Sequence, residues 1–517
     1  MGNRLSTPAE SISRIQESLL SQFTNDEREC LINVFNGFCG IDSAKDHNQS
    51  DVDDQIKKIE RTEGIKLTDV QQYLPQIVAD SLNSGFAKCF QYESINIKQS
   101  TATKPSSEKQ GDSITIHGFL SSIKKLTRST LLDEAQTVFI IYRACGCALR
   151  TFVRDVMHAS ITYWFEGAYD LSKINDVEFI PVTIAVLSND DKNEQHENGL
   201  LEFLLLVPSF STLKEFEIDS YFDETSFIDW YMKNAPFQTL IKIFTKRLFL
   251  TAHRSALLLT PKQMTNLRKA NLLAPQIVTS FPTESFSQLL SPADYFLLVD
   301  SLPSNCRATL HTMIFSSTID GDSWHTFVNS LLYQGSVMII VKDTDGYVFG
   351  GFTYEDWDVQ PRFYGSSLNF LFTAQPKLRV YSGASGTNEN WQYLNFGTQT
   401  LPNGLGMGGQ LDYFGFWIDS NFVTGHSKAA PLSSTYSSPR LSKQEEFKID
   451  QVEVWLVKPT ERDPDTIPSQ SKHSVMDRNP GEMALLEMAG NDGAVRKIGY
   501  SKFVREPDVL PVEGDNE

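Results

Sequence analysis

Residues 348–352 read Val-Phe-Gly-Gly-Phe, residues 402–410 read Pro-Asn-Gly-Leu-Gly-Met-Gly-Gly-Gln, and residues 452–455 read Val-Glu-Val-Trp. They are the densest parts of an aromatic-rich stretch from Tyr333 to Val457, in which glycines fall between short apolar runs. Glycines in such positions form tight corners between strands, whereas a nucleotide-binding loop places them directly before a helix. The stretch therefore predicts a β-sheet with tight turns.

Six segments of this stretch show the period-two alternation of strands. They are Val337–Lys342, Val348–Thr353, Phe370–Thr373, Arg379–Tyr381, Phe414–Asp419 and Lys448–Val457. Residues 343–346 read Asp-Thr-Asp-Gly, which predicts a hairpin turn between the first two strands. Two short helices are expected just before the strands, at Ser291–Leu302 and Asp322–Leu332.

The first half of the chain predicts helices. Apolar residues recur at helical spacing from Ser13 to Phe38, and Thr24 to Glu27 form a capping box that opens a second helix. Residues 64–70 and 113–120 each place an extended apolar pair before a helix start, as the exit half of an EF-hand does. The oxygen ligands of a calcium loop are missing there, so no calcium binding is expected.

The chain is expected to divide into four regions. Residues 1–130 form an EF-hand-like helical region with a flexible loop at 95–112, and residues 131–286 form a helical middle. Residues 287–458 form the strand-rich domain, and residues 459–517 hold a linker, a short helix at 480–490 and an acidic tail.

The composition indicates a cytosolic protein that does not bind nucleic acid. Lysine and arginine number 46 and aspartate and glutamate 64, so the formal charge is −18, which disfavours contact with nucleic acid phosphates. No apolar run approaches the length of a membrane helix, and polar residues interrupt the segment where a signal core would lie. The six cysteines are scattered without a Cys-x-x-Cys pair, so reduced thiols are expected.

The N-terminal sequence Met1-Gly2-Asn3-Arg4-Leu5-Ser6 fits the N-myristoylation pattern. The acyl chain is added to a glycine amine once Met1 is removed, so Gly2 is the expected lipidation site. A chance match is the alternative, because the pattern is short. One myristoyl group binds membranes only marginally, so we expect reversible membrane contact that a protein partner reinforces.

Residues 404–409 satisfy Gly-x-Gly-x-x-Gly, but a strand rather than a helix is expected after them. We interpret these glycines as structural: they supply positive φ and let a loop lie tightly on the sheet. The structural glycines of the region are Gly350, Gly351, Gly404, Gly406, Gly408 and Gly409.

Other residues of the region lack the spacing that catalysis or metal binding needs. His325 and His426 are too far apart for a metal-ligand pair, and Cys306 is the region's only cysteine. Glu453 lies among apolar neighbours and should therefore have a partner, so we expect a hydrogen-bonded residue of an edge strand. No catalytic residue, metal or cofactor is expected.

The strand-rich region resembles the TLDc domain. Ile314–Ser317 with Asp320–Ser323 is similar to the family's opening block, and further motifs follow in the family's order. These are Val348–Phe352, Phe370–Phe372, Tyr393–Asn395, Gly404–Gln410 and Glu453–Trp455. The N-terminal start, EF-like helices, helical middle and terminal helix together resemble the mTOR-associated, enhancer-of-akt type subfamily. The loops at 95–112 and 190–199 look expanded by comparison.

This resemblance implies an α+β fold, in which an EF-hand-like helical half precedes an antiparallel β-sandwich with flanking helices. It implies no catalytic activity, an association with the vacuolar proton pump, the V-ATPase, and a link to oxidative-stress resistance. For the subfamily it implies mTOR or insulin-type signalling at lysosomal membranes. The expected location is the cytoplasmic face of lysosomal membranes, with the plasma membrane as a further candidate, and the cytoplasm.

The terminal helix carries the expected partner-binding residues Met483, Leu485, Leu486 and Met488. Such an apolar face either folds back on its own protein or enters a partner's groove, and the helix pattern alone leaves both open. The resemblance favours the V-ATPase as partner. We therefore expect a non-enzymatic, membrane-associated adaptor. The alternative is an oxidative-stress protein with a redox or peroxide-related activity.

Overall fold

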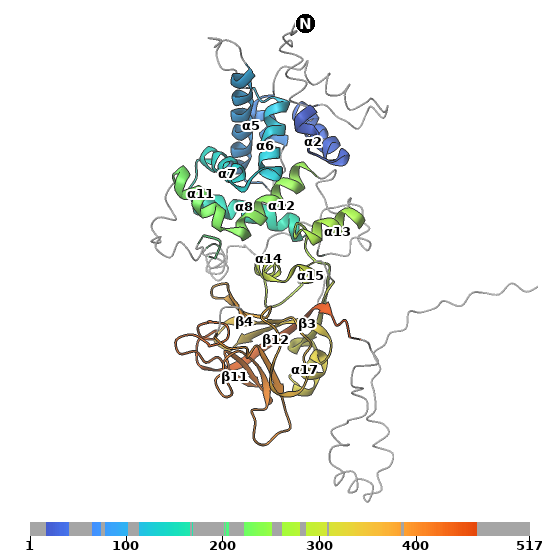
Figure 1. Ribbon diagram of the computed structural model, residues 1–517, viewed down its shortest axis with the longest axis vertical. Helices are drawn as coiled ribbons and strands as arrows, with labels where there is room; N and C mark the ends of the chain where they lie inside the picture. Colours follow the sequence, from blue (N-terminus) through green and yellow to red (C-terminus); the bar gives the residue numbers. More distant parts are fainter. Residues whose placement is uncertain are drawn as a thin grey trace, which may run out of the picture. The chain divides into compact units, whose positions relative to one another are not determined.

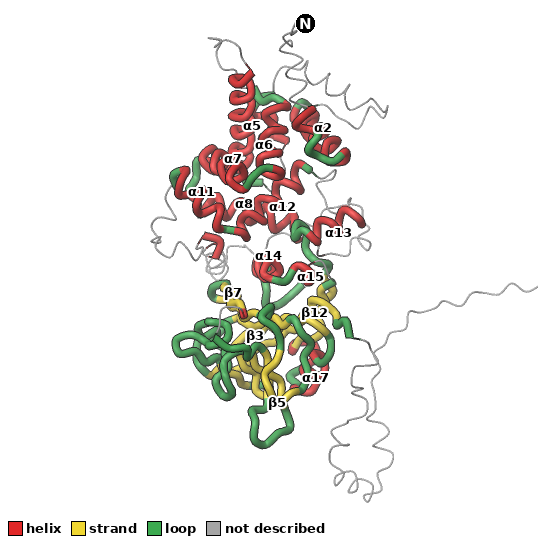
Figure 2. The backbone as a smooth tube through the Cα atoms, viewed as in Figure 1, coloured by secondary structure: helices red, strands yellow, loops and turns green. Residues whose placement is uncertain are grey.

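The computed structural model describes residues 17–40, 65–73, 78–101, 113–165, 168, 201, 203–205, 222–250, 261–279, 286–307, 310–383 and 387–462 (Figure 1). Helices make up most of the described chain before residue 270, and strands dominate after it (Figure 2). The strands pair almost entirely antiparallel. The predicted α+β fold is thus confirmed. No helix among the described residues is long and apolar enough to cross a membrane.

The helical part contains α2 (Asn25–Phe38), α4 (Leu67–Tyr73), α5 (Asp80–Thr101), α6 (Ile116–Arg128), α7 (Leu131–Cys145), α8 (Leu149–Phe165), α11 (Glu224–Lys233), α12 (Ala235–Phe249) and α13 (Pro261–Lys269). Helix α2 begins with the predicted capping box. The Glu27 N–H donates to Thr24 Oγ1 at 3.3 Å, and the Thr24 N–H donates to the Glu27 carboxylate at 2.9 Å. These bonds satisfy two donors that a helix start leaves open.

The two extended apolar pairs of the first half meet, as the sequence pattern indicates for an EF-hand-like unit. Ile65 and Ile114 form an antiparallel bridge, with N···O distances of 3.2 and 2.8 Å, and helices α4 and α6 follow the two segments. The expected loop at 95–112 is partly wrong, because α5 continues to Thr101. Residues 102–112 lie outside the described residues.

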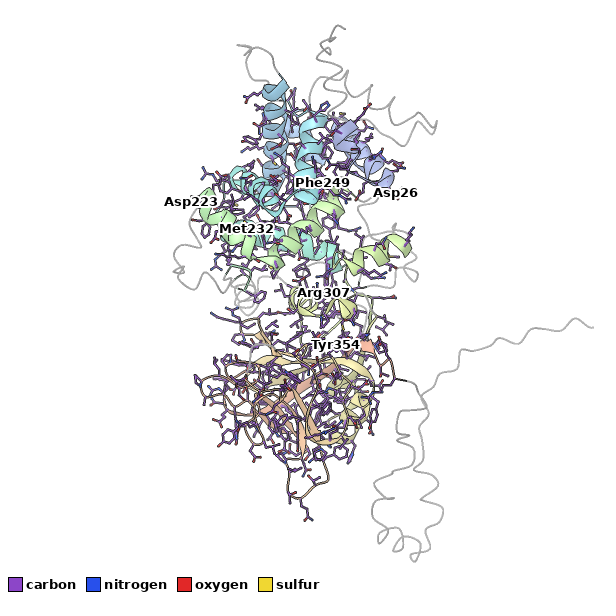
Figure 3. All side chains as sticks on the ribbon, viewed as in Figure 1. Asp26, Asp223, Met232, Phe249, Arg307 and Tyr354 are labelled. Carbon is purple, nitrogen blue, oxygen red and sulfur yellow. The ribbon has the colours of Figure 1, made fainter. Side chains whose placement is uncertain are left out.

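The helices pack around a cluster of phenyl rings. The Phe119 ring lies 5.1 Å from the Phe90 ring and 5.9 Å from the Phe249 ring, centroid to centroid. The Phe249 side chain lies among the helices in Figure 3. Phe35, Phe38 and Phe86 join the same core. Because each ring buries a large apolar area, this cluster is a main source of stability in the helical half.

The strands are β1 (Ile277–Val278), β2 (His311–Ser316), β3 (Gly335–Asp343), β4 (Val348–Thr353), β5 (Gln360–Tyr364), β6 (Phe370–Gln375), β7 (Arg379–Ser382), β8 (Gln392–Asn395), β9 (Gly404–Met407), β10 (Phe416–Asp419), β11 (Thr424–His426) and β12 (Glu446–Pro459). They follow the order β5-β8-β9-β10-β11-β12-β3-β4-β6-β7, and β2 pairs with β12. The pair β1–β2 is parallel, unlike the other pairs.

The long strand β12 connects two layers. Its first residues, Glu446–Lys448, pair with β11, while the rest pairs with β3 on one side and β2 on the other. The layer of β3, β4, β6 and β7 therefore folds over the layer of β5 and β8–β11. The Phe349 ring of β4 lies 6.1 Å from the Phe416 ring of β10, which places both in the core between the sheets.

The first layer is buried on both faces, which explains why β3 is continuously apolar from Val337 to Val341. Ile339 and Val341 point into the core between the sheets, whereas Met338 and Ile340 point to the opposite face. This alternation follows from the period of two in a strand. The opposite face joins the core that also contains residues of α14 (Pro292–Ser301).

Helix α14 packs against both halves of the chain. The Phe296 ring lies 5.1 Å from the Trp164 ring of α8, and the Tyr295 ring lies 6.4 Å from the Trp455 ring of β12. Helix α15 (Ser304–Arg307) follows, and Asn305 donates to the Tyr354 hydroxyl at 2.8 Å, beyond the end of β4. Helices α16 (Ser317–Asp320) and α17 (Trp324–Leu331) lie after β2.

Candidate functional site

Strand β4 owes its two glycines to close packing. A Cβ on Gly351 would lie 2.4 Å from Sδ of Met407, in β9 of the facing sheet, and a Cβ on Gly350 would lie 1.9 Å from the Ile339 carbonyl oxygen. Both distances are far below van der Waals contact. Neither glycine has a positive φ, so space rather than backbone conformation requires glycine here.

The glycines of β9 face outward and leave room for aromatic rings. A Cβ on Gly404 would lie 2.4 Å from the Trp417 ring, and a Cβ on Gly406 would lie 2.5 Å from the Phe414 ring. Their neighbours Leu405 and Met407 point inward to the core between the sheets. The expectation that these two glycines supply positive φ in a loop is wrong, because they lie in an extended strand.

Gly408 and Gly409 do take positive φ, at 73° and 81°. They turn the chain away from β9, and the Gly409 N–H donates to Thr435 Oγ1 at 2.8 Å. Side chains are disfavoured at such φ values, so glycine is required at this turn. Close packing of neighbouring atoms therefore requires glycine at 350, 351, 404 and 406, whereas positive φ requires it at 408 and 409.

An aromatic cluster covers the outer face of the second sheet. Phe414 stacks on Trp417 at 4.4 Å, and Tyr393 lies 5.5 Å from Phe414, with Phe363 alongside. The His426 imidazole stacks on Trp417 at 5.7 Å. Burial, with a smaller contribution from the Lys428 cation, lowers the pKa of His426 to about 4. The histidine is therefore neutral at physiological pH and acts as a member of the aromatic cluster.

Glu453 is buried in the centre of a sheet. It pairs with Ser316 of β2 and Ile340 of β3, so its expected position on an edge strand is wrong. Its carboxylate accepts hydrogen bonds from Ser287 Oγ at 2.6 Å, from the Gln288 N–H at 2.8 Å and, more weakly, from the Trp455 indole at 3.2 Å. Burial raises its pKa, against the effect of these donors. The expectation of a hydrogen-bonded partner is confirmed.

A second buried ionisable group, which no sequence motif indicates, is His311 of β2. His311 Nδ1 lies 2.5 Å from the Tyr295 hydroxyl, and its Nε2 lies 2.9 Å from the Cys306 carbonyl oxygen. The carbonyl can only accept, so Nε2 carries the proton and Nδ1 accepts from the tyrosine. Burial lowers the pKa of His311 to about 4, which keeps it neutral.

Cys306 is poorly suited to redox or nucleophilic chemistry. Its side chain is buried, and burial raises the pKa of the thiol to about 11. The thiolate is the reactive form of cysteine, and little of it exists at neutral pH with such a pKa. His325 is exposed on α17. Among the described residues no group of three or more His, Cys, Asp or Glu side chains could hold a metal ion.

The loops that join the outer strands expose apolar side chains. Tyr413 is 65% exposed, Leu432 53% and Leu411 41%. The two segments that carry them are tied together, because the Lys428 N–H donates to the Phe414 carbonyl at 2.9 Å and the Lys428 ammonium lies 5.2 Å from the Tyr413 ring centroid. We call Leu411, Tyr413 and Leu432 the loop surface. Tyrosine is enriched in protein interfaces.

A protein-family model matches the part of the chain that forms the β-sandwich. The family described as "TLDc domain" matches residues 283–458, which include α14, the Glu453 network and every strand from β2 to β12 except the last residue of β12. Residues 283–458 are a TLDc domain. The glycines of β4 and β9 and the aromatic cluster all lie within it.

Relatives share this TLDc domain with the chain. MTOR-associated protein MEAK7 from Xenopus laevis is 51% identical over 178 residues, 34% of this chain and 38% of the relative. The human protein of that name is 42% identical over 180 residues, covering 35% and 38%. Oxidation resistance protein 1 from Rattus norvegicus is 29% identical over 170 residues, covering 33% and 19%. The matched region spans about two fifths of the length of the MEAK7 proteins.

Several predicted sites lie outside the described residues. They are the lipidation site Gly2 and the partner-binding residues Met483, Leu485, Leu486 and Met488. Within the TLDc domain, Glu453 and His311 are tied into hydrogen bonds and His426 is stacked on a ring, whereas the loop surface is exposed to solvent. This arrangement can bind another macromolecule through its outside.

Proposed function

We propose that this protein is a non-enzymatic, membrane-associated adaptor in mTOR or insulin-type signalling at the lysosome. In this proposal the TLDc domain and the C-terminal segment at 480–490 bind the V-ATPase, and a myristoyl group on Gly2 brings the protein to the cytoplasmic face of the membrane. The supporting observation is a TLDc domain that is 42–51% identical to the proteins named MTOR-associated protein MEAK7.

The interior of the TLDc domain supports a binding role. Glu453 accepts three hydrogen bonds, His311 is held neutral between two partners, and Cys306 is protonated. Each group thus stabilises the fold, and none is presented to solvent as a nucleophile or base. The loop surface of Leu411, Tyr413 and Leu432 supplies apolar area for a partner. Contact through several weak points raises the overall affinity without any single strong site.

The partner assignment is tested by capture from detergent-solubilised membranes. The full chain is compared with a chain that ends at Arg462, which keeps β12 and the bond from the Thr460 N–H to the Gln334 carbonyl intact. We expect the full chain to retain V-ATPase subunits and the shortened chain to retain about tenfold less. Leu486→Asp should act like the truncation, whereas Val495→Asp, in the same tail but beyond the 480–490 segment, should not. Failure of the full chain to retain any pump subunit contradicts the proposal.

The membrane assignment needs its own test. Gly2→Ala removes the amine that accepts the acyl chain, so it should move the protein from the membrane to the soluble fraction. Asn3→Ala keeps the acceptor glycine and serves as the control. Equal membrane fractions for the Gly2→Ala variant and the unaltered chain would remove the lipid from the proposal but leave the pump contact untouched.

The alternative function is a redox or peroxide-related enzyme, which the 29% identity to Oxidation resistance protein 1 brings into consideration. The chemistry of Cys306 disfavours it, since burial raises the pKa of this thiol to about 11. Peroxide consumption by the purified protein that Cys306→Ser abolishes would favour the enzyme over the adaptor.

A further inference from the structure

Two cysteine thiols meet at the end of α7 in the helical half. Cys145 is the last residue of the helix, Gly146 caps it in the left-handed conformation with φ 68° and ψ 23°, and Cys147 follows. The two thiols are hydrogen-bonded to each other, and both side chains are partly exposed. The sequence predicts reduced thiols here, because the Cys-x-Cys spacing does not suit a zinc site.

The backbone places the two cysteines at disulfide distance. A residue with helical φ and ψ of either hand separates the Cα atoms of its neighbours by about 5.5 Å, given a helix radius of about 2.3 Å and a rise of about 1.5 Å. Disulfides need a Cα separation of about 4.4–6.8 Å. Gly146 therefore holds Cys145 and Cys147 within reach of each other, and a side chain at that position would resist the left-handed conformation.

The surroundings make the two thiols unequal. The hydrogen bond from Cys145 lowers the pKa of Cys147, and the Arg154 guanidinium adds to this effect, against burial and the Asp155 carboxylate. The same pairing with Cys147, together with burial, raises the pKa of Cys145. Burial also raises the pKa of Cys30 and Cys306 to about 11 and that of Cys89 to about 12. Cys147 is thus the described thiol with the most thiolate at neutral pH.

We propose that Cys145 and Cys147 form a redox-responsive dithiol that hydroperoxides convert to an intrachain disulfide. The Cys147 thiolate attacks one oxygen of the hydroperoxide, the O–O bond breaks, and the leaving alkoxide or hydroxide takes up a proton. Cys147 is then a sulfenic acid. The Cys145 sulfur attacks the Cys147 sulfur, the S–S bond forms, and the sulfenic oxygen leaves as water with the Cys145 proton. Each hydroperoxide is reduced to an alcohol or water.

The dithiol lies at the end of α7, which packs on α5. A Cβ on Gly85 of α5 would lie 2.6 Å from Cys145 Sγ, so the sulfur rests against the α5 backbone. Lys88 of α5 donates to the Ala144 carbonyl at 3.3 Å, in the last turn of α7. A disulfide redirects Cys145 Sγ toward Cys147 and therefore alters this helix contact. A disulfide that closes so short a loop is strained and therefore readily reduced, which suits a reversible modification.

The full-length protein offers a direct test by mass spectrometry. Arg143 and Arg150 flank the pair, so trypsin releases both cysteines in the single peptide 144–150, Ala-Cys-Gly-Cys-Ala-Leu-Arg. After hydrogen peroxide treatment and alkylation, we expect this peptide to lose about 2 Da and to escape alkylation. The peptides with Cys30, Cys89 and Cys306 should remain alkylated, and the peptide 144–150 should oxidise at least about tenfold faster than these. Dithiothreitol should restore both alkylation sites.

Single variants assign the two roles. In Cys145→Ser the sulfenic acid cannot be resolved, so dimedone should label Cys147. In Cys147→Ser dimedone should leave Cys145 unlabelled, because burial still raises the pKa of that thiol when its partner is absent. Equal labelling of the two variants, or oxidation of the peptide no faster than at Cys306, would overturn the proposal.

Phenylarsine oxide tests the proximity of the thiols without any oxidant, since it bridges two neighbouring thiols. We expect one arsenical per chain, bound at peptide 144–150 and lost in either single variant. Binding that survives in both variants would show that the dithiol lies elsewhere and would overturn the assignment.

Discussion

At the scale of single residues, the hydrogen bonds of Glu453 predict that replacing one carboxylate oxygen by an amide nitrogen measurably lowers the stability of the fold. In Glu453→Gln the amide must point a donor either at the Gln288 N–H or at the Trp455 indole, because both carboxylate oxygens accept from donors. We expect the free energy of unfolding to fall by about 1–3 kcal/mol. Urea denaturation followed by tryptophan fluorescence measures the change.

The control for this variant lies in the same strand. Glu446 begins β12 and is exposed, so Glu446→Gln should change the free energy of unfolding by less than about 0.5 kcal/mol. If the two variants were equally stable, the carboxylate of Glu453 would contribute nothing through its hydrogen bonds.

His311 predicts a pH dependence with a defined sign. Burial lowers its pKa to about 4, whereas an unfolded histidine titrates near pH 6.5, so only the unfolded chain takes up the proton between these values. Stability from this group is complete above pH 6.5 and falls as the pH falls toward 4, by about 2 kcal/mol between pH 7.5 and 5.0. Burial also lowers the pKa of His426, whereas it raises the pKa of Glu453.

The contribution of His311 is isolated by comparison with His311→Gln. Urea midpoints of both proteins at pH 7.5 and 5.0 give a double difference in which the other titrating groups cancel. We expect the unaltered protein to lose about 2 kcal/mol more than the variant over this range. Parallel losses in the two proteins would mean that His311 takes up its proton equally in both states.

At the scale of elements, the close packing of β9 against aromatic rings predicts that one added methyl group disturbs the aromatic cluster. Gly406→Ala places a Cβ 2.5 Å from the Phe414 ring, so the ring or the strand must move. Overpacking of this kind destabilises by about 1–3 kcal/mol. The near-ultraviolet circular dichroism of Trp417 should weaken as well. The control Gly346→Asn lies in an open turn where an added Cβ meets nothing within 4 Å; it strains the backbone at φ 86° but should leave the spectrum unchanged.

Elements with a local signal could be predicted from the sequence. Strands β3 and β4 are short apolar runs, and the turn between them ends in Gly346 with φ 86°, so their hairpin follows from adjacent residues. The capping box at Thr24 and Glu27 is equally local. These features depend on neighbours in the chain, so one sequence is enough to find them.

Features that depend on distant partners were missed or misread. The glycine-rich run at β9 predicts a loop with positive φ, whereas the rings that require glycine come from Phe414 and from Trp417 of β10, further along the chain. Glu453 is predicted to lie on an edge strand, because no residue near it in the sequence indicates the pairing of β12 with β2. The partners of His311 likewise come from α14 and α15.

At the scale of the whole molecule, the proposed adaptor combines several weak attachments. A single myristoyl group gives marginal membrane binding, and the loop surface is small compared with a stable protein interface. Joined in one chain, each contact raises the effective concentration of the others. Loss of any one attachment should therefore weaken the assembly strongly without abolishing it.

The loop surface gives the most direct test of this view. Tyr413 is 65% exposed, so Tyr413→Ser should leave the urea midpoint nearly unchanged and yet reduce capture of V-ATPase subunits about tenfold, because exposed tyrosines in interfaces contribute disproportionately. Val423→Ser, at a 56% exposed apolar side chain in the β10–β11 turn outside the loop surface, is the control and should leave capture unchanged. Full capture by Tyr413→Ser would remove the loop surface from the interface and assign the contact to another face of the TLDc domain or to the segment at 480–490.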